Sequence, residues 1–440
     1  MTKTIMALLS DYKSRKVSPL DEVKQQLLKI EASPLNAFIT VLPEQAKHDA
    51  QCVQDRISAG DSLRSLEGIT IAIKDLIDVE GIRTTMGAES YVNNIAKEDA
   101  EVIRLLKHAG AIIIGKANTH QFAYGATGDR SYFGPVRNPK DSNRISGGSS
   151  SGSVAAVASG LVHIAIGTDT SASIRLPAAL CGVVGMKPTL GLVSKQGVFN
   201  LSETLDHVGP ISRSVEDNAI LLEVIADKPV GTYSRKIGQS IKGLIVCVPK
   251  EFYGEYVSTA VKVQLEKAIE KLKAAGAEIR HIEIANIYEI YQAQQLILKT
   301  EAYATHEDML EAQTPYIQEV KDRLLTGKDV LASEYLRRKK LQYQAQASFD
   351  DVLASVDVIL TATCGITAPL LDERSTEING QMHPTQWLLT RLTAPTNFSG
   401  HPSLSVPFGE DDKGLPIGLQ LIGRMHDEAT VYQFGEVLER

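Results

Sequence analysis

The chain has 440 residues, and its 46 Lys and Arg residues against 53 Asp and Glu residues give a formal net charge of −7. This balance argues against a nucleic-acid-binding surface, and no apolar stretch approaches the about 18 residues that cross a membrane. The four cysteines form no Cys-x-x-Cys pair, and the first apolar run is shorter than that of a secretory signal. We therefore expect a cytoplasmic protein with reduced cysteines and no membrane contact.

The first half of the chain predicts helices that alternate with short buried strands. Ser18 and Pro19 suit the N-cap and first position of a helix that runs to about Ile30. Further helices are predicted over 43–59, 98–108 and 153–161, and strands over 69–74, 111–114 and 162–167. Strands separated by helices predict parallel pairing with helical crossovers.

The second half adds more strands and one long helical region. Strands are predicted over 182–187, 242–248, 277–284, 357–361, 403–407 and 417–422, and helices over 258–275 and from 428. Residues 286–355 are helical almost throughout, which predicts a helical layer or cap. No linker interrupts the chain. We therefore expect one α/β domain over 1–440, with a mixed, mostly parallel central sheet covered by helices on both faces.

The segment 146–175 contains two serine clusters. The first, at 146–153, is too rich in Gly and Ser to form a core by itself, and such a backbone suits a tight turn or close approach to a ligand. The second, at 171–173, follows the strand predicted over 162–167. Ligands of open α/β sheets bind at the carboxyl ends of strands. The two clusters together therefore suggest a nucleophile site, while the first alone is equally consistent with a flexible turn and helix cap.

Several common catalytic and binding motifs do not match this sequence. Residues 148–152 match Gly-x-Ser-x-Gly, but the polar residues 138–144 before them do not form the strand that this nucleophile motif requires. No phosphate-binding glycine motif is present. The ten histidines are dispersed and predict no metal site, and neither His401 nor His426 is marked as a base.

A lysine can replace histidine as the base if it is neutral. Lys74 ends the apolar strand 69–74 and is followed by Asp75, so an exposed lysine paired with a carboxylate is one interpretation. Burial is the other, because desolvation lowers the pKa of a lysine. In that case Ser149 and Ser173 would serve as proton relay and nucleophile.

At this point the sequence resembles the amidase signature family of Ser–Ser–Lys amide hydrolases. The resemblance runs from about residue 36 to the end of the chain. It is carried by GITIAIKD at 68–75, GKAN at 115–118, GPVRNP at 134–139, SGGSSSGS at 146–153, GTDTSASIRLPAA at 167–179, CGVVGMKPT at 181–189 and PIGLQLIGR at 416–424.

The resemblance implies the amidase signature fold and a set of roles. Lys74 would be the base, Ser149 the relay after a cis peptide bond from Gly148, and Ser173 the nucleophile that forms the acyl-enzyme. The oxyanion hole would consist of the backbone amides of Thr170, Ser171, Ala172 and Ser173. Ser150 would add a hydrogen bond near the relay, while Asp169 and Arg175 would brace the loop. No metal or cofactor is implied.

Two departures from the family pattern concern the pocket. Ser171-Ala172 replaces the usual Gly-Gly, so either this backbone is allowed for L-residues or the oxyanion hole is altered. The added atoms predict a small or slim acyl group. His120 stands where many relatives carry an acidic residue, and it is expected to be structural rather than to line the pocket.

The expected function is hydrolysis of a small-molecule amide by a stand-alone amidase. One alternative is the glutaminase-type A subunit of a tRNA-dependent amidotransferase. Of the functions considered, only this one would involve a nucleic-acid partner. Another is a non-catalytic binding protein on the same scaffold. The signature core is expected over about 65–215 and a variable pocket region over about 286–400, with Tyr124, Trp387 and Arg391 as candidate pocket residues. A homodimer is common among relatives and is a further expectation.

Overall fold

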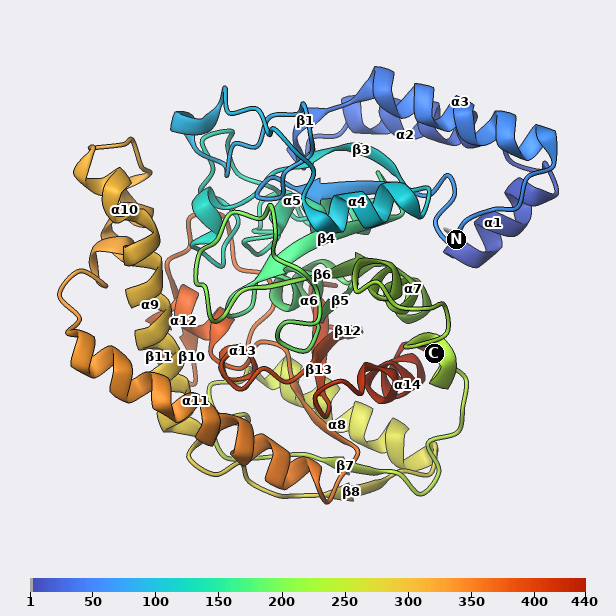
Figure 1. The fold of residues 1–440 in the computed structure, drawn as a ribbon. Helices are drawn as coiled ribbons and strands as arrows, with labels where there is room; N and C mark the ends of the chain where they lie inside the picture. Colours follow the sequence, from blue (N-terminus) through green and yellow to red (C-terminus); the bar gives the residue numbers. More distant parts are fainter. Residues whose placement is uncertain (1–2) are drawn as a thin grey trace.

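The computed structural model describes residues 3–440, whose strands form one large sheet and a separate ribbon (Figure 1). The strands are β1 (Phe38–Val41), β2 (Thr70–Lys74), β3 (Ile112–Ala117), β4 (Ile164–Asp169), β5 (Val184–Lys187), β6 (His207–Ser212), β7 (Ile245–Cys247), β8 (Glu278–Arg280), β9 (Val358–Ala362), β10 (Ser375–Ile378), β11 (Gln381–Pro384), β12 (Ser403–Glu410) and β13 (Pro416–Ile422). The 11-stranded sheet has the order β1-β3-β2-β4-β6-β5-β12-β13-β9-β7-β8, and β10 pairs with β11.

The sheet is mixed, as expected, but its antiparallel ladders outnumber the parallel ones, which lie in two blocks. β2 pairs in parallel with β3 and with β4, and β7 pairs in parallel with β8 and β9. This confirms parallel strands with helical crossovers over 69–167. All other ladders of the sheet are antiparallel. The parallel β2–β4 ladder brings the end of β2, at Lys74, beside the end of β4, at Asp169.

Helices cover both faces of the sheet. They are α1 (Ile5–Lys13), α2 (Pro19–Glu31), α3 (Pro43–Ala59), α4 (Glu101–His108), α5 (Ser151–Ala158), α6 (Arg175–Cys181), α7 (Val215–Ile225), α8 (Thr259–Ala274), α9 (Ile287–Glu311), α10 (Gln318–Leu325), α11 (Ala332–Leu353), α12 (Thr385–Thr390), α13 (Ala394–Ser399) and α14 (Glu428–Glu439). Short 3-10 helices occur at Glu89–Tyr91, Gln121–Ala123 and Ser234–Lys236. α5 and α6 contact each other and the central strands, while α4, α7, α14 and α8 form a row of contacting helices.

The helical region predicted over 286–355 consists of α9, α10 and α11, which form an outer layer along one side of the molecule (Figure 1). α9 contacts α10, α11 and α13. α13 in turn supplies Asn397, which hydrogen-bonds to Asp169 at the end of β4. The layer therefore lies against the edge of the sheet where β2 and β4 end.

Several strands differ from the prediction in extent, β3 and β8 among them. β3 continues through Gly115–Ala117, which we expected to follow the strand. Gly115 is required there because a Cβ atom would lie 2.3 Å from the carbonyl oxygen of Thr40 on the neighbouring β1. β8 is shorter than the predicted 277–284 because its pairing with β7 covers only three residues.

Candidate active site

Lys74 is fully buried at the end of β2. Burial lowers the pKa of its ammonium group to about 7, although the charges of Asp206 and Asp169 act in the opposite direction. The interpretation of Lys74 as an exposed strand-end residue is therefore wrong. A lysine with this pKa is substantially neutral near pH 7 and can accept a proton.

The contacts of Lys74 fix the direction of its lone pair. Its Nζ atom lies 2.7 Å from Ser149 Oγ, 3.0 Å from Ser150 Oγ and 2.7 Å from Thr168 Oγ1. Ser150 donates its hydroxyl proton to the carbonyl oxygen of Thr168 at 3.1 Å, so it can only accept from Lys74. A neutral amine that donates to Ser150 and Thr168 keeps its lone pair for the hydroxyl proton of Ser149.

Asp75 follows Lys74 in the chain but does not pair with it. Its carboxylate lies 2.9 Å from the ammonium group of Lys116, which is also fully buried, and accepts from the backbone N–H of Thr85 at 2.9 Å. Successive side chains of a strand point to opposite faces, which explains why neighbours in sequence have separate partners. Lys74 is therefore left without a contacting carboxylate that would keep it charged.

The two serine clusters meet beside Lys74. The peptide bond between Gly148 and Ser149 is cis, as the family resemblance implied. The backbone N–H of Ser150 donates to the carbonyl oxygen of Ser173 at 3.2 Å, which joins the two loops. Among residues 3–440, however, the Ser173 hydroxyl has no hydrogen-bond partner, Ser149 included. It lines a cavity instead.

Backbone donors surround this hydroxyl. Within the described chain, the backbone N–H groups of Ser171, Ala172 and Ser173 donate no hydrogen bond. Neither Ser171 nor Ala172 has a positive φ, so the sequence departure from Gly-Gly is accommodated by a backbone allowed for L-residues. These three amides can therefore still serve as donors for an oxyanion.

The Ser171 side chain connects the loop to the outer helical layer. Gln294 on α9, which is completely buried, donates from Nε2 to Ser171 Oγ at 2.7 Å and to the carbonyl oxygen of Thr170 at 3.3 Å. Gln295 donates to Gln294 Oε1 at 2.7 Å, which fixes the orientation of that amide. On the other side, Thr170 donates its hydroxyl proton to Asp206 at 2.6 Å.

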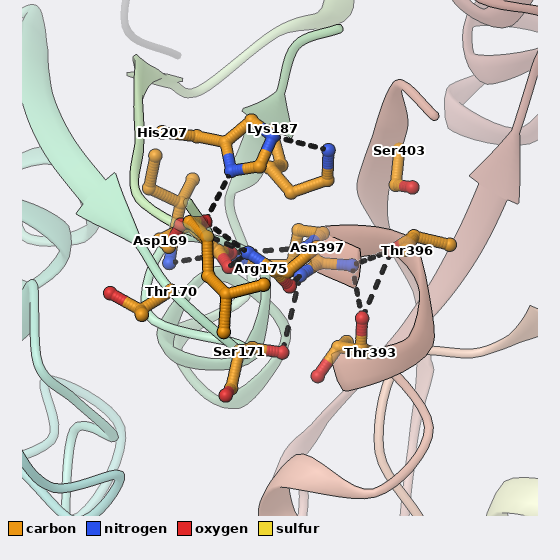
Figure 2. A network of polar contacts seen from close by, with 12 residues as sticks. Asp169, Thr170, Ser171, Arg175, Lys187, His207, Thr393, Thr396, Asn397 and Ser403 are labelled. Carbon is orange, nitrogen blue, oxygen red and sulfur yellow. Dashed lines mark hydrogen bonds and ion pairs between the residues drawn. The ribbon is translucent and has the colours of Figure 1, made fainter. Parts of the chain in front are cut away.

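Asp169 and Arg175 hold the loop through a network of polar contacts (Figure 2). Arg175 Nη2 lies 2.9 Å from Asp169 Oδ1 and 2.6 Å from Asn397 Oδ1, and it donates to the carbonyl oxygen of Ser171 at 3.2 Å. Burial raises the pKa of the Asp169 carboxyl, but Arg175 and Asn397 outweigh it and leave that pKa well below its usual value. Both residues are fully buried, and their contacts join the loop to Asn397 on α13.

A cavity of about 510 Å³ opens above the loop. From the loop side it is lined by Thr170, Ser171, Ala172 and Ser173, with Ala123, Tyr124, Gly125, Ala126 and Leu201. The remaining wall is formed by Tyr291, Gln292, Gln295, Leu296, Leu298, Lys299, Arg323, Thr326, Pro384, Gln386, Trp387 and Thr390. All residues of this second set lie between 286 and 400, the region expected to form the pocket, and Tyr124 and Trp387 line it as expected.

Arg391 does not line the cavity, contrary to expectation. Its guanidinium group stacks over Phe252, with 4.1 Å to the ring centroid, and donates to the carbonyl oxygen of Phe252 at 2.8 Å. The stack with Trp387 places it behind the pocket wall. His120 is likewise absent from the lining: it is buried beneath Gly125, and burial, together with the charge of Arg323, lowers its pKa to about 3.

Sequence reasoning missed Gln294, Lys299 and Arg323. Their helical spacing marks only an amphipathic surface, and nothing local indicates that α9 lies against the oxyanion loop. Among residues 3–440, no group of three or more His, Cys, Asp and Glu side chains could hold a metal ion. Over the same residues, no helix has the length and apolar character needed to cross a membrane.

Comparisons with known proteins agree with this geometry. The sequence model of the amidase family matches residues 22–432. The A subunit of glutamyl-tRNA(Gln) amidotransferase from Geobacter metallireducens is 36% identical over 475 aligned positions, which cover 99% of this chain and 96% of that protein.

Two solved structures are similar over nearly the whole chain. A protein described as an amidase superposes with a TM-score of 0.93 at 29% identity and covers 99% of each chain. The A subunit of glutamyl-tRNA(Gln) amidotransferase from Thermotoga maritima superposes with a TM-score of 0.80 at 32% identity, over 98% of this chain and 93% of that one.

Proposed function

Because the chain belongs to the amidase family, we propose that it hydrolyses a carboxylic amide through an acyl-enzyme on Ser173. Water and the amide R–CO–NH–R′ give the acid and the amine or ammonia. The observation that carries the proposal is the fully buried Lys74, which contacts Ser149 at 2.7 Å and no carboxylate. A neutral base of this kind can activate a serine hydroxyl without histidine.

Proton transfer proceeds through Ser149. Ser149 gives its proton to Lys74 and takes the proton of Ser173, whose Oγ atom attacks the amide carbon. This step requires the Ser173 hydroxyl, which lines the cavity, to approach Ser149 when substrate is bound; catalytic hydrogen bonds often tighten only in that complex. Lys74 then returns the proton through Ser149 to the leaving nitrogen as the carbon–nitrogen bond breaks.

The backbone amides of Ser171, Ala172 and Ser173 bind the oxyanion, with Thr170 at the start of the same loop. Donors positioned in this way contribute about 3–4 kcal/mol each. Water then attacks the acyl-enzyme, again with Lys74 and Ser149 as base and relay, and releases the acid. The unpaired cysteines agree with our placement of the enzyme in the cytoplasm.

Labelling of Ser173 tests the chemistry directly. A fluorophosphonate probe should add one phosphonyl group to Ser173, located by peptide mass spectrometry, and Lys74→Ala should slow this addition strongly. An unlabelled Ser173 together with no ammonia release from any amide would instead favour a non-catalytic binding protein.

A second candidate is the glutaminase-type A subunit of a tRNA-dependent amidotransferase. The sequence relatives favour it, because the Geobacter protein of that name is 36% identical over nearly the whole chain. The stand-alone amidase is supported by the higher TM-score of the amidase structure and by Ser171-Ala172 in place of the family's usual Gly-Gly. Glutaminase activity that rises severalfold when the other amidotransferase subunits are added would support this second candidate. Turnover of other amides by the purified chain alone would support the amidase.

A further inference from the structure

The charges that line the cavity are all positive. Lys299 and Arg323 both line it, and none of its lining residues in the described chain is Asp or Glu. The two cations differ in their surroundings. Arg323 is paired with Glu319 at 3.1 Å, whereas Lys299 is half-buried and forms no ion pair with a carboxylate among residues 3–440.

The backbone of Lys299 is connected through α9 to the loop that carries Ser173. Lys299 lies on the same helix as Gln294, which contacts Ser171, and the helix rise of about 1.5 Å per residue places its backbone about 7.5 Å farther along α9. The backbone there is fixed by tight packing, since a Cβ atom at Gly327 would lie 2.0 Å from the Lys299 carbonyl oxygen.

Several apolar side chains contribute to the cavity wall. Tyr124, Tyr291, Leu296 and Trp387 line the same cavity as Lys299. In such surroundings an unpaired ammonium group attracts an anion more strongly than it would in water. A ligand ammonium group, in contrast, finds no carboxylate and is repelled by Lys299.

We propose that the substrate is an anionic amide, the monoamide of a dicarboxylic acid without an α-ammonium group, whose carboxylate pairs with Lys299 while its amide carbon lies at Ser173. This inference rests on the proposed function and specifies its substrate class. A free carboxylate at the end of a short carbon chain satisfies the unpaired cation, and the chain itself contacts the apolar walls. Free glutamine carries the same amide and carboxylate but adds an ammonium group that the cavity leaves unpaired.

Three five-carbon amides test the charge requirement at constant length: glutaramate (anionic), pentanamide (neutral) and L-glutamine (zwitterionic). Ammonia release should give a kcat/KM for glutaramate about 10- to 100-fold above that for pentanamide, the range expected for one charge-assisted contact. L-Glutamine should be a poorer substrate than glutaramate. Equal or better turnover of pentanamide or L-glutamine would overturn the inference while leaving the amidase function intact.

Variants of Lys299 test the assignment of the contact. Lys299→Met should reduce the glutaramate-to-pentanamide ratio to about 1, mainly through KM, while Lys299→Arg should keep most of it. Lys340→Met, at an exposed position of α11 outside the cavity, is the matched control and should keep the ratio of the unmodified enzyme. A ratio that survives Lys299→Met would contradict the proposal.

A binding measurement separates failure of this inference from failure of the proposed function. 5-Oxohexanoate, the methyl ketone analogue of glutaramate, should protect Ser173 from fluorophosphonate labelling at lower concentration than neutral 2-hexanone does, and Lys299→Met should abolish the difference. Labelling without preferential protection by 5-oxohexanoate overturns only the anionic substrate. Absence of labelling and of turnover overturns the hydrolase itself.

Discussion

The titration of Lys74 should control the pH dependence of catalysis. An ordinary lysine with a pKa of 10.5 is neutral in only about 0.03% of molecules at pH 7, whereas Lys74, with a pKa of about 7, is neutral in about half. The protonated form cannot accept the proton of Ser149. We therefore expect kcat/KM to fall about tenfold per pH unit below pH 7, to about 1% of its plateau at pH 5, and to be level above about pH 8.

The assay is coupled ammonia release under kcat/KM conditions from pH 5 to 9, with the rate of fluorophosphonate labelling measured in parallel. Both should show the same acid limb, because both require a deprotonated Ser173. A kcat/KM that is still rising tenfold per pH unit at pH 9, or a labelling rate without an acid limb, would refute Lys74 as a neutral base. As a control, urea unfolding over the same pH range shows whether the enzyme stays folded where its activity falls.

The buried Lys74 makes the free energy of unfolding rise with pH, whereas a lysine in a salt bridge would make it fall. The unfolded chain keeps this proton up to pH 10.5 and the folded chain releases it near pH 7, so the contribution of Lys74 to the free energy of unfolding rises with pH between these values. Lys74→Met removes a group that is costly to bury when charged. It should abolish catalysis without reducing stability at pH 7.

Three further variants test the surrounding geometry. Ser173→Ala should reduce ammonia release by about 10⁴-fold or more and leave no covalent adduct in the mass spectrum; turnover near that of the unmodified enzyme would place the nucleophile elsewhere. Arg175→Met leaves the Asp169 carboxylate buried without its cation, so urea unfolding should show a loss of about 3–5 kcal/mol, and an unchanged midpoint would mean that this ion pair does not secure the loop. Gly152→Ala places a Cβ atom 2.2 Å from the carbonyl oxygen of Ala37, so we expect about 1–3 kcal/mol of destabilisation and lower kcat, and a neutral result would contradict the close packing of α5.

The strands and the reacting residues could largely be predicted from the sequence. Apolar runs preceded by glycine located β2, β3 and β4, and the motifs placed Ser149 and Ser173 on two loops. Spacing alone did not predict the burial of Lys74, because a lysine followed by an aspartate at a strand end favours a surface ion pair. The partner of Asp75 is Lys116 on the neighbouring β3, and only the three-dimensional pairing shows this.

The sequence predicted the region that forms the pocket wall, but not the individual residues that line it. Helical periodicity over 286–355 marks amphipathic surfaces, but it does not show which surface of α9 lies against the loop. Lys299 therefore gave no local signal, and Arg391 was wrongly assigned because its stack on Phe252 depends on distant contacts. Local sequence patterns do not predict the positions of polar side chains whose contacts are more than a hundred residues away in the chain.

The hydrogen bond from Gln294 to Ser171 has an evolutionary consequence. Where a variable segment only lines the pocket, changes in it alter which substrate binds and leave the rate of bond cleavage to the catalytic core. Here the same helix both lines the pocket and holds the loop that carries the nucleophile. Drift in α9 would therefore alter selectivity and turnover together, and new substrate ranges would arise through paired changes at positions 171 and 294.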